Sequence, residues 1–236
     1  MYNLHLLALS PSLPIVSSHF VDVFKNTSPF FKATYIVARV EASGHFKSIY
    51  SRALRYPICG RAVFKIICRL VKDYELSPTP PIKIPRRLFR SLLPANGREW
   101  SDEDYPLPFL RDIYCTPNLP LINVDANEGY ALAKAVHAQF IPLVKFLLAK
   151  GASPMCHDGK AVKIAIRLKD FDMFKMLVEW PQSRSGKIKC QGRRSTILDS
   201  SMMGIAISSG ASDIVEFFQK KGVVPDIVAL SKLVMC

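Results

Sequence analysis

The stretch Val144-Lys145-Phe146-Leu147-Leu148-Ala149-Lys150-Gly151-Ala152-Ser153-Pro154 carries an aliphatic face, a glycine and a proline in that order. Apolar residues at three- and four-residue spacing are typical of one face of a helix. A glycine just past such a run accepts the left-handed conformation that ends a helix, and a following proline prevents continuation. We therefore predict a short helix that Gly151 closes.

The same pattern recurs when three segments are aligned on an alanine. Eight residues after Ala135, Ala165 and Ala206 come the apolar pairs Leu143-Val144, Met173-Phe174 and Ile214-Val215. In the first and third segments a glycine and a proline then follow (Gly151 and Pro154, Gly222 and Pro225), whereas the second has Pro181 at the glycine position. The alanines are 30 and 41 residues apart, and the extra residues fall in a loop around 185–195.

The pattern predicts that a short helix carrying the alanine alternates with a longer aliphatic helix. This alternation has a physical explanation. The small alanine side chain lets the next unit approach closely, and a single unit cannot bury its own apolar face. The sequence thus predicts an all-α fold, a helix-turn-helix solenoid with an N-terminal helical region. An ordinary helical domain with chance periodicity is the alternative.

The segment 144–154 resembles the second helix and terminal turn of the ankyrin repeat family, and the resemblance covers roughly residues 122–226. The chain departs from the family where the first helix opens with Thr-Pro-Leu-His. In its place stand Tyr130-Ala131-Leu132-Ala133, Lys160-Ala161-Val162-Lys163 and Ser201-Met202-Met203-Gly204. The resemblance implies an ankyrin-like stack of degenerate units near residues 126–154, 155–182 and 196–225.

The rest of the chain predicts a division into three parts. Residues 1–76 are expected to be a helical region, either worn repeats or a separate domain. Its helices are predicted over 17–40, with a break at Pro29, and over 46–56 and 61–74. Residues 77–104 contain Ser-Pro-Thr-Pro-Pro-Ile-Lys-Ile-Pro and a short basic helix, which predicts a linker. Residues 105–236 hold the ankyrin-like repeats, preceded by a helix over 105–114, and residues 226–236 begin another repeat or a cap.

The ankyrin resemblance implies that a partner binds to the turn tips and to the exposed side of each first helix. The chain is then a protein–protein interaction adaptor or scaffold. The positions that match the family's variable contacts are Ala126, Asn127, Gly129, His137 and Ala138, then Cys156, His157, Gly159, Arg167 and Leu168, then Ile197, Leu198, Ser200, Ser208 and Ser209. Packing of several of them against the next turn is the alternative.

The net charge of +13 is concentrated in residues 1–100, which hold 15 Lys and Arg against 5 Asp and Glu. Such a basic half favours an acidic partner, and it predicts nucleic-acid or acidic-membrane binding as the alternative function. The residues for that function are Arg61, Lys65, Arg69, Lys72, Arg86, Arg87 and Arg90. A plain solvated face is the other interpretation. The basic loop 186–195 is either a nuclear-import signal, a phosphate contact or a solvated insertion.

The sequence offers no constellation that predicts catalysis, a metal or a cofactor. The loop Gly186–Ser195 has five residues between its glycines where a phosphate-binding loop has four, and the five histidines lack zinc spacing. Cys156-His157 is the one adjacent pair of nucleophile and base, and nothing obvious orients its imidazole. We therefore expect a protein that is not an enzyme.

No two of the six cysteines are separated by two residues, the spacing of zinc and redox motifs. This favours reduced thiols and an intracellular location, cytoplasmic or nuclear. Pro11 and Pro14 interrupt the apolar start of the chain, so we do not expect a cleaved secretory signal. The sequence contains no run of eighteen apolar residues, so we do not expect a transmembrane helix.

Overall fold

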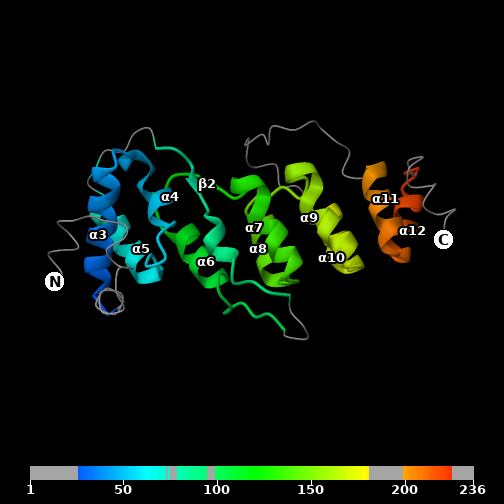
Figure 1. The fold of residues 1–236 in the computed structure, drawn as a ribbon, viewed down its shortest axis with the longest axis horizontal. Coiled ribbons are helices and arrows are strands. Elements are labelled where there is room, and N and C mark those ends of the chain that lie inside the picture. The colour runs from blue at the N-terminus through cyan, green and yellow to red at the C-terminus, as the bar shows by residue number, and fades with distance from the viewer. Residues whose placement is uncertain (1–25, 73, 75–78, 95–98, 181–198, 225–236) are drawn as a thin grey trace. The chain divides into compact units, whose positions relative to one another are not determined.

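The structure, a computed structural model, describes residues 26–72, 74, 79–94, 99–180 and 199–224 (Figure 1). These residues are mostly helical, with one very small sheet. None of the helices in the described ranges is long and apolar enough to cross a membrane. The part of the first predicted helix before residue 26, the loop 186–195 and the segment 226–236 lie outside the described residues.

The chain divides into two compact units, neither of which is continuous in sequence. Unit 1 comprises Met1–Arg87 and Pro108–Asn123, and unit 2 comprises Leu88–Leu107 and Val124–Cys236. The predicted linker over 77–104 supplies core residues to both units, because Ile82 and Ile84 are buried in unit 1 and Leu88 and Phe89 in unit 2. The division of the chain at residues 76 and 104 stays a prediction.

The helices of unit 1 begin where the sequence signals indicate. Ser28 caps the first helix by accepting a hydrogen bond from the Phe31 amide at 3.2 Å, and Pro29 occupies its first turn. The predicted helices over 46–56 and 61–74 are confirmed with narrower bounds, and the helix predicted over 105–114 is confirmed over 107–115. The elements are α3 (Pro29–Ala42), η2 (Phe46–Ser48), α4 (Ile49–Ala53), α5 (Arg61–Leu70), η3 (Arg86–Phe89) and α6 (Leu107–Cys115).

A two-stranded parallel sheet corrects the all-α prediction. β1 (Ile82–Lys83) pairs with β2 (Ile122–Asn123), with Ile82 opposite Ile122, and the Lys83 amide donates to the Ser51 hydroxyl at 2.9 Å. The prolines around residue 80 exclude a helix but permit extended backbone. Two residues are too few to give the alternating apolar pattern that predicts a strand.

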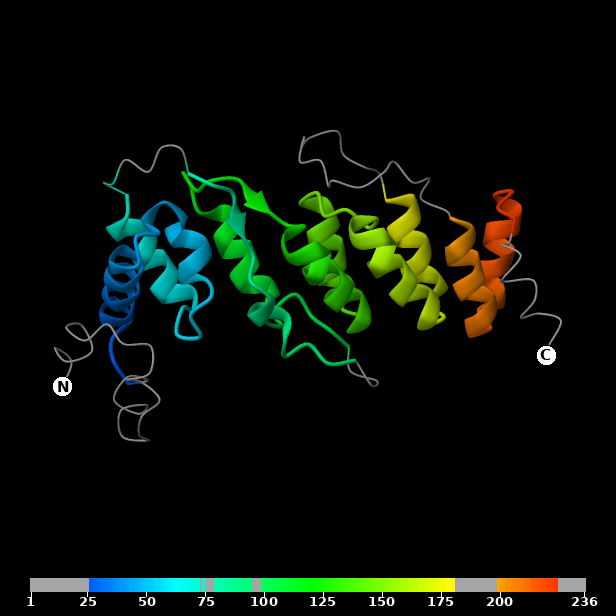
Figure 2. The same ribbon diagram turned by 45° about the horizontal axis from the view of Figure 1, so that its top comes forward.

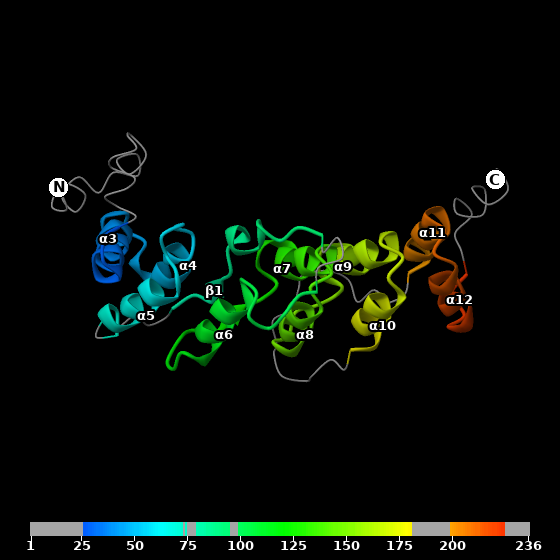
Figure 3. The same ribbon diagram turned by 90° about the horizontal axis from the view of Figure 1, so that it is seen from below.

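Unit 2 contains three helix pairs that pack in sequence order. α7 (Ala126–His137) and α8 (Ile141–Ala149) form the first pair, α9 (Cys156–Arg167) and α10 (Phe171–Glu179) the second, and α11 (Ser200–Ser209) and α12 (Ser212–Lys220) the third. α9 packs against both α7 and α11, and α10 packs against α12. Figure 3 shows α7, α9 and α11 in one row and α8, α10 and α12 in another, and Figure 2 shows the same order of pairs.

Small residues allow this close packing between first helices. Ala135, Ala165 and Ala206 are each 0% exposed, as their alignment predicts. Between the second helices the contact is aromatic, since the Phe174 ring lies 5.4 Å from that of Phe217 and 5.6 Å from that of Phe218. The predicted helices of all three segments are confirmed, but the predicted order of their lengths is wrong. The alanine-bearing helices α7, α9 and α11 have 12, 12 and 10 residues, whereas α8, α10 and α12 have 9 residues each.

Each helix pair turns at a residue in the left-handed conformation. Gln139, Lys169 and Gly210 have φ of 54°, 55° and 67°. The amide of the next residue in each case donates to the carbonyl of the buried alanine, at 3.0 to 3.2 Å. Gly151 and Gly222, with φ of 89° and 74°, follow α8 and α12 in the conformation that the sequence predicts.

Trp100 packs against the turn between α7 and α8 within unit 2. Its ring stacks on Phe140 at 4.7 Å and 14°, and its indole Nε1 donates to the Ala138 carbonyl at 2.8 Å. The stacked area and the satisfied indole N–H together hold Trp100 against this turn.

Candidate functional site

The same unusual turn precedes the first two alanine-bearing helices of unit 2. Asn127, Glu128 and Gly129 have φ of 58°, 65° and 67°, and thirty residues later His157, Asp158 and Gly159 have φ of 53°, 55° and 69°. Left-handed backbone costs a non-glycine residue about 1–2 kcal/mol. Because four non-glycine residues adopt it, their surroundings must impose the turn. We call residues 127–129 and 157–159 the two tips.

Contacts between successive helix pairs of unit 2 hold the tips in place. A Cβ atom on Gly129 would lie 3.0 Å from Cys156 Cβ, and one on Gly159 would lie 2.2 Å from Met202 Cε. The Ser153 amide donates to Asp125 Oδ1 at 2.9 Å and so ties the chain before one tip to the chain before the next. Positive φ favours glycine at both tips, and the close approach of Cys156 Cβ favours it further at Gly129, whereas the Met202 methyl group at Gly159 is the end of a flexible side chain.

The outer side of the tips is polar and lies open to solvent. The side chains of Asn127, Glu128, His157 and Asp158 are exposed. His157 Nε2 lies 3.9 Å from Glu128 Oε2, an exposed contact that stabilises the protein by at most about 1 kcal/mol. Because the two tips lie this close together, a partner can contact side chains of both at once.

The predicted partner-binding residues divide by burial. Asn127, His157, Arg167, Leu168 and Ser208 are exposed, and His137, Cys156, Ser200 and Ser209 are half-buried. Ala126, Gly129, Ala138 and Gly159 are buried within unit 2, and their assignment to a partner surface stays a prediction. Ile197 and Leu198 lie outside the described residues. Glu128 and Asp158 were not among the predicted residues.

Unit 1 contains a cleft with a volume of about 1040 Å³. Its walls are the exposed side of α5, the residues that follow α5, and the loop 115–120 after α6. The cations Lys65, Arg69 and Lys72 line it, together with Tyr50, Cys68, Val71, Tyr74, Thr79, Asp112 and Cys115–Pro120. We call it the basic cleft.

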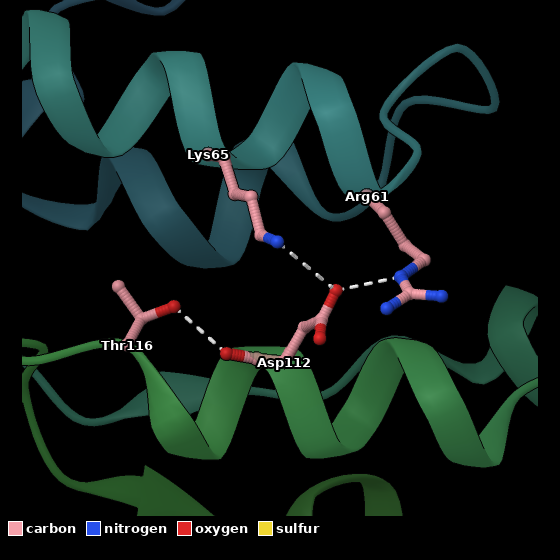
Figure 4. A network of polar contacts seen from close by, with 4 residues as sticks. All are labelled: Arg61, Lys65, Asp112 and Thr116. Atoms are coloured by element: carbon pink, nitrogen blue, oxygen red, sulfur yellow. Dashed lines mark hydrogen bonds and ion pairs between the residues drawn. The ribbon is translucent and has the colours of Figure 1, made fainter.

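One carboxylate organises the end of the basic cleft nearest the start of α5 (Figure 4). Asp112 Oδ2 accepts from Arg61 Nε at 2.6 Å and lies 3.6 Å from Lys65 Nζ. The Thr116 hydroxyl donates to the Asp112 carbonyl at 2.8 Å and fixes the first turn after the helix. The hydrogen bond from Arg61 is the main reason that the pKa of Asp112 lies below its ordinary value.

The Asp112 network predicts a pH-dependent contribution to stability. A carboxyl whose pKa is lowered by folding stabilises the protein above its unfolded pKa, and that contribution is lost as the pH falls through the folded pKa. Because the Arg61 side chain is 55% exposed, we expect Asp112→Asn to lower the free energy of unfolding near pH 7 by no more than about 1 kcal/mol. In urea titrations this difference should shrink as the pH is lowered below the ordinary pKa of an aspartate and Asp112 becomes protonated. A difference that does not change with pH would contradict the assignment.

The other predicted polyanion contacts serve different purposes. Arg87 is half-buried and donates to the carbonyls of Leu54 and Cys59, so its guanidinium joins η3 to the chain after α4. These hydrogen bonds occupy the guanidinium, and the assignment of Arg87 to a polyanion surface stays a prediction. Arg86 and Arg90 are exposed but do not line the basic cleft, and Arg90 belongs to unit 2.

The described cysteines, 59, 68, 115 and 156, are free thiols. Burial raises the pKa of Cys59 to about 12 and that of Cys68 to about 11, so both stay protonated near neutral pH. Cys115, by contrast, is exposed at the basic cleft. Within the described residues, no group of three or more His, Cys, Asp or Glu side chains could hold a metal ion.

Comparison with known proteins adds no family to these observations. No protein-family model, no curated protein and no solved structure matches the chain.

Proposed function

We propose that the chain is a protein–protein interaction adaptor whose unit 2 is a short solenoid of degenerate ankyrin-like repeats. The packing of α7, α9 and α11 in one row and of α8, α10 and α12 in another supports the repeat assignment. The equivalent left-handed turns at Gln139, Lys169 and Gly210 support it further. A solenoid of this kind offers a long surface that no single repeat could form.

The observation that carries the proposal is the tip built twice at a thirty-residue interval. Each tip holds non-glycine residues in a strained conformation, and such strain is commonly retained where it orients side chains for a function. The strained residues present amide, carboxylate and imidazole groups to solvent rather than to the core. They suit a protein partner with its own mixed polar surface.

The partner surface consists of the two tips and the exposed end of α9. Arg167 and Leu168 are exposed where α9 ends, and they add a cation and an apolar contact. An adaptor that works inside the cell fits the free thiols of the described cysteines, because disulfides persist in oxidising compartments.

The proposal is tested with two variants matched in position. Asn127→Ala with His157→Ala alters both tips, whereas Lys145→Ala with Lys175→Ala alters exposed residues on α8 and α10 at the same thirty-residue interval. Proteins captured by the full chain are identified by mass spectrometry, and one partner is then purified. We expect the tip variant to weaken its Kd by about tenfold or more and the control variant by less than about twofold.

Binding that both double variants weaken equally would contradict the proposal, and so would binding that the tip variant leaves unchanged. Circular dichroism and thermal unfolding of each variant show whether its fold is kept. All four residues are exposed, so we expect each variant to unfold within a few degrees of the original chain.

The alternative function, nucleic-acid or acidic-membrane binding, loses part of its predicted surface. Arg61 and Lys65 are paired with Asp112, and Arg87 is bonded to backbone carbonyls. A duplex or a membrane is held by an extended row of cations. Of the predicted cations that remain, Arg69 and Lys72 line the basic cleft, whereas Arg86 and Arg90 do not. Two cations in one cleft favour a compact ligand.

A further inference from the structure

We propose that the basic cleft of unit 1 binds a phosphorylated small molecule with an aromatic ring, of the size of a nucleoside monophosphate. The proposal concerns unit 1 alone and does not depend on the adaptor function of unit 2. The cleft volume of about 1040 Å³ lies at the upper end of the range for small-molecule sites and leaves room for a nucleotide with its water.

The charge of the cleft selects an anion. Lys65 and Arg69 are four residues apart and lie on one side of α5, and Lys72 lines the cleft from the turn that follows this helix. Within the described part of the chain, Arg69 and Lys72 have no ion-pair partner, whereas Lys65 shares Asp112 with Arg61. Arg69 and Lys72 are thus available to a ligand.

The charges of the described groups at the cleft leave a positive surplus when the Asp112 carboxylate and two helix ends are set against the cations. α5 and α6 both end at the cleft, and each carboxyl end carries about half a negative charge. Against these two ends and the Asp112 carboxylate stand the cations Arg61, Lys65, Arg69 and Lys72, which leaves a surplus of about two. A phosphate monoester carries close to two negative charges at neutral pH and can accept bonds from both Arg69 and Lys72.

An aromatic side chain stands beside the free cations. Tyr74 is 50% exposed and lines the cleft, and its ring lies 4.9 Å from that of Phe46, which restrains its orientation. A restrained, exposed tyrosine ring is a platform on which a planar ligand ring can stack, a contact that tolerates different bases. Tyr74 and Lys72 are two positions apart, so a ring on the first can carry a phosphate toward the second.

Binding is tested on the full chain by calorimetry with adenosine monophosphate, adenosine and inorganic phosphate as probes. We expect adenosine monophosphate to bind with a Kd below about 1 mM and more tightly than either fragment. The variant Arg69→Gln with Lys72→Gln should weaken this Kd by about tenfold or more. Tyr74→Ala should weaken the binding of adenosine monophosphate but leave any binding of inorganic phosphate unchanged.

The matched control is Arg55→Gln with Lys47→Gln, which removes the same charges from exposed positions of unit 1 outside the cleft. We expect it to change the Kd by less than about twofold. A second measurement uses the exposed Cys115 thiol in the cleft. Alkylation of Cys115 is monitored by peptide mass spectrometry. Adenosine monophosphate should slow this alkylation in the original chain but not in the variant Arg69→Gln with Lys72→Gln.

Three results would overturn the proposal. One is the absence of both nucleotide binding and Cys115 protection at about 1 mM probe. Another is equal weakening by the cleft variant and the control variant. The third is tight binding of a single-stranded oligonucleotide or of vesicles with acidic lipid when adenosine monophosphate does not bind, which would assign the cations to a macromolecular or membrane surface.

Discussion

Phe174→Ala is expected to lower the free energy of unfolding of unit 2 by about 3–5 kcal/mol. The side chain is 0% exposed, and its ring meets those of Phe217 and Phe218, so its removal leaves a cavity between α10 and α12. Both tryptophans of the chain, Trp100 and Trp180, belong to unit 2. Their fluorescence during urea unfolding therefore measures the stability of this unit.

Ile141→Ala is the control for this cavity. Ile141 begins α8 and is 44% exposed, so its truncation should cost less than about 1 kcal/mol. A similar loss from the two substitutions would mean that the aromatic contact between α10 and α12 does not hold the second and third helix pairs together.

Ala165→Leu is expected to destabilise unit 2 by about 1–3 kcal/mol. Ala165 is fully buried in α9, the helix that contacts both α7 and α11, so three additional carbon atoms have no space. The measurement is again urea unfolding followed by tryptophan fluorescence. The result depends on close approach of the first helices, which is the property that the repeat assignment requires.

Ala149→Leu gives the comparison for this substitution, because Ala149 is exposed on α8 and a leucine there meets solvent. We expect a change within about 0.5 kcal/mol. If Ala165→Leu were tolerated equally well, the alanines at the aligned positions would not be set by packing.

The helices of unit 2 are predictable from sequence because their signals are local. The eight-residue step from each alanine to the next apolar pair and the glycine sixteen residues on are visible within one segment. The left-handed turn at residue 139 or 169 is less visible. Gln139 and Lys169 stand where a glycine would normally mark it, as Gly210 does in the third pair.

The basic cleft was only partly predictable. The four- and three-residue spacing of Lys65, Arg69 and Lys72 is visible in the sequence, and the amphipathic pattern predicts that these cations form a row. Their carboxylate partner is Asp112, which is 51 residues beyond Arg61, and no periodicity links residues that far apart. For the same reason sequence reasoning missed Tyr50 and Tyr74 as lining residues and treated Arg87 as a free cation.

The pairing of Ile82 with Ile122 has a consequence for biosynthesis. The Ile82 amide donates to the Leu121 carbonyl at 2.8 Å, so this edge of unit 1 has no partner until about forty further residues have been made. A nascent chain that has reached only the proline-rich segment around residue 80 lacks its second strand and all of α6. It therefore presents unpaired backbone and uncovered apolar side chains to chaperones and proteases until translation passes residue 123.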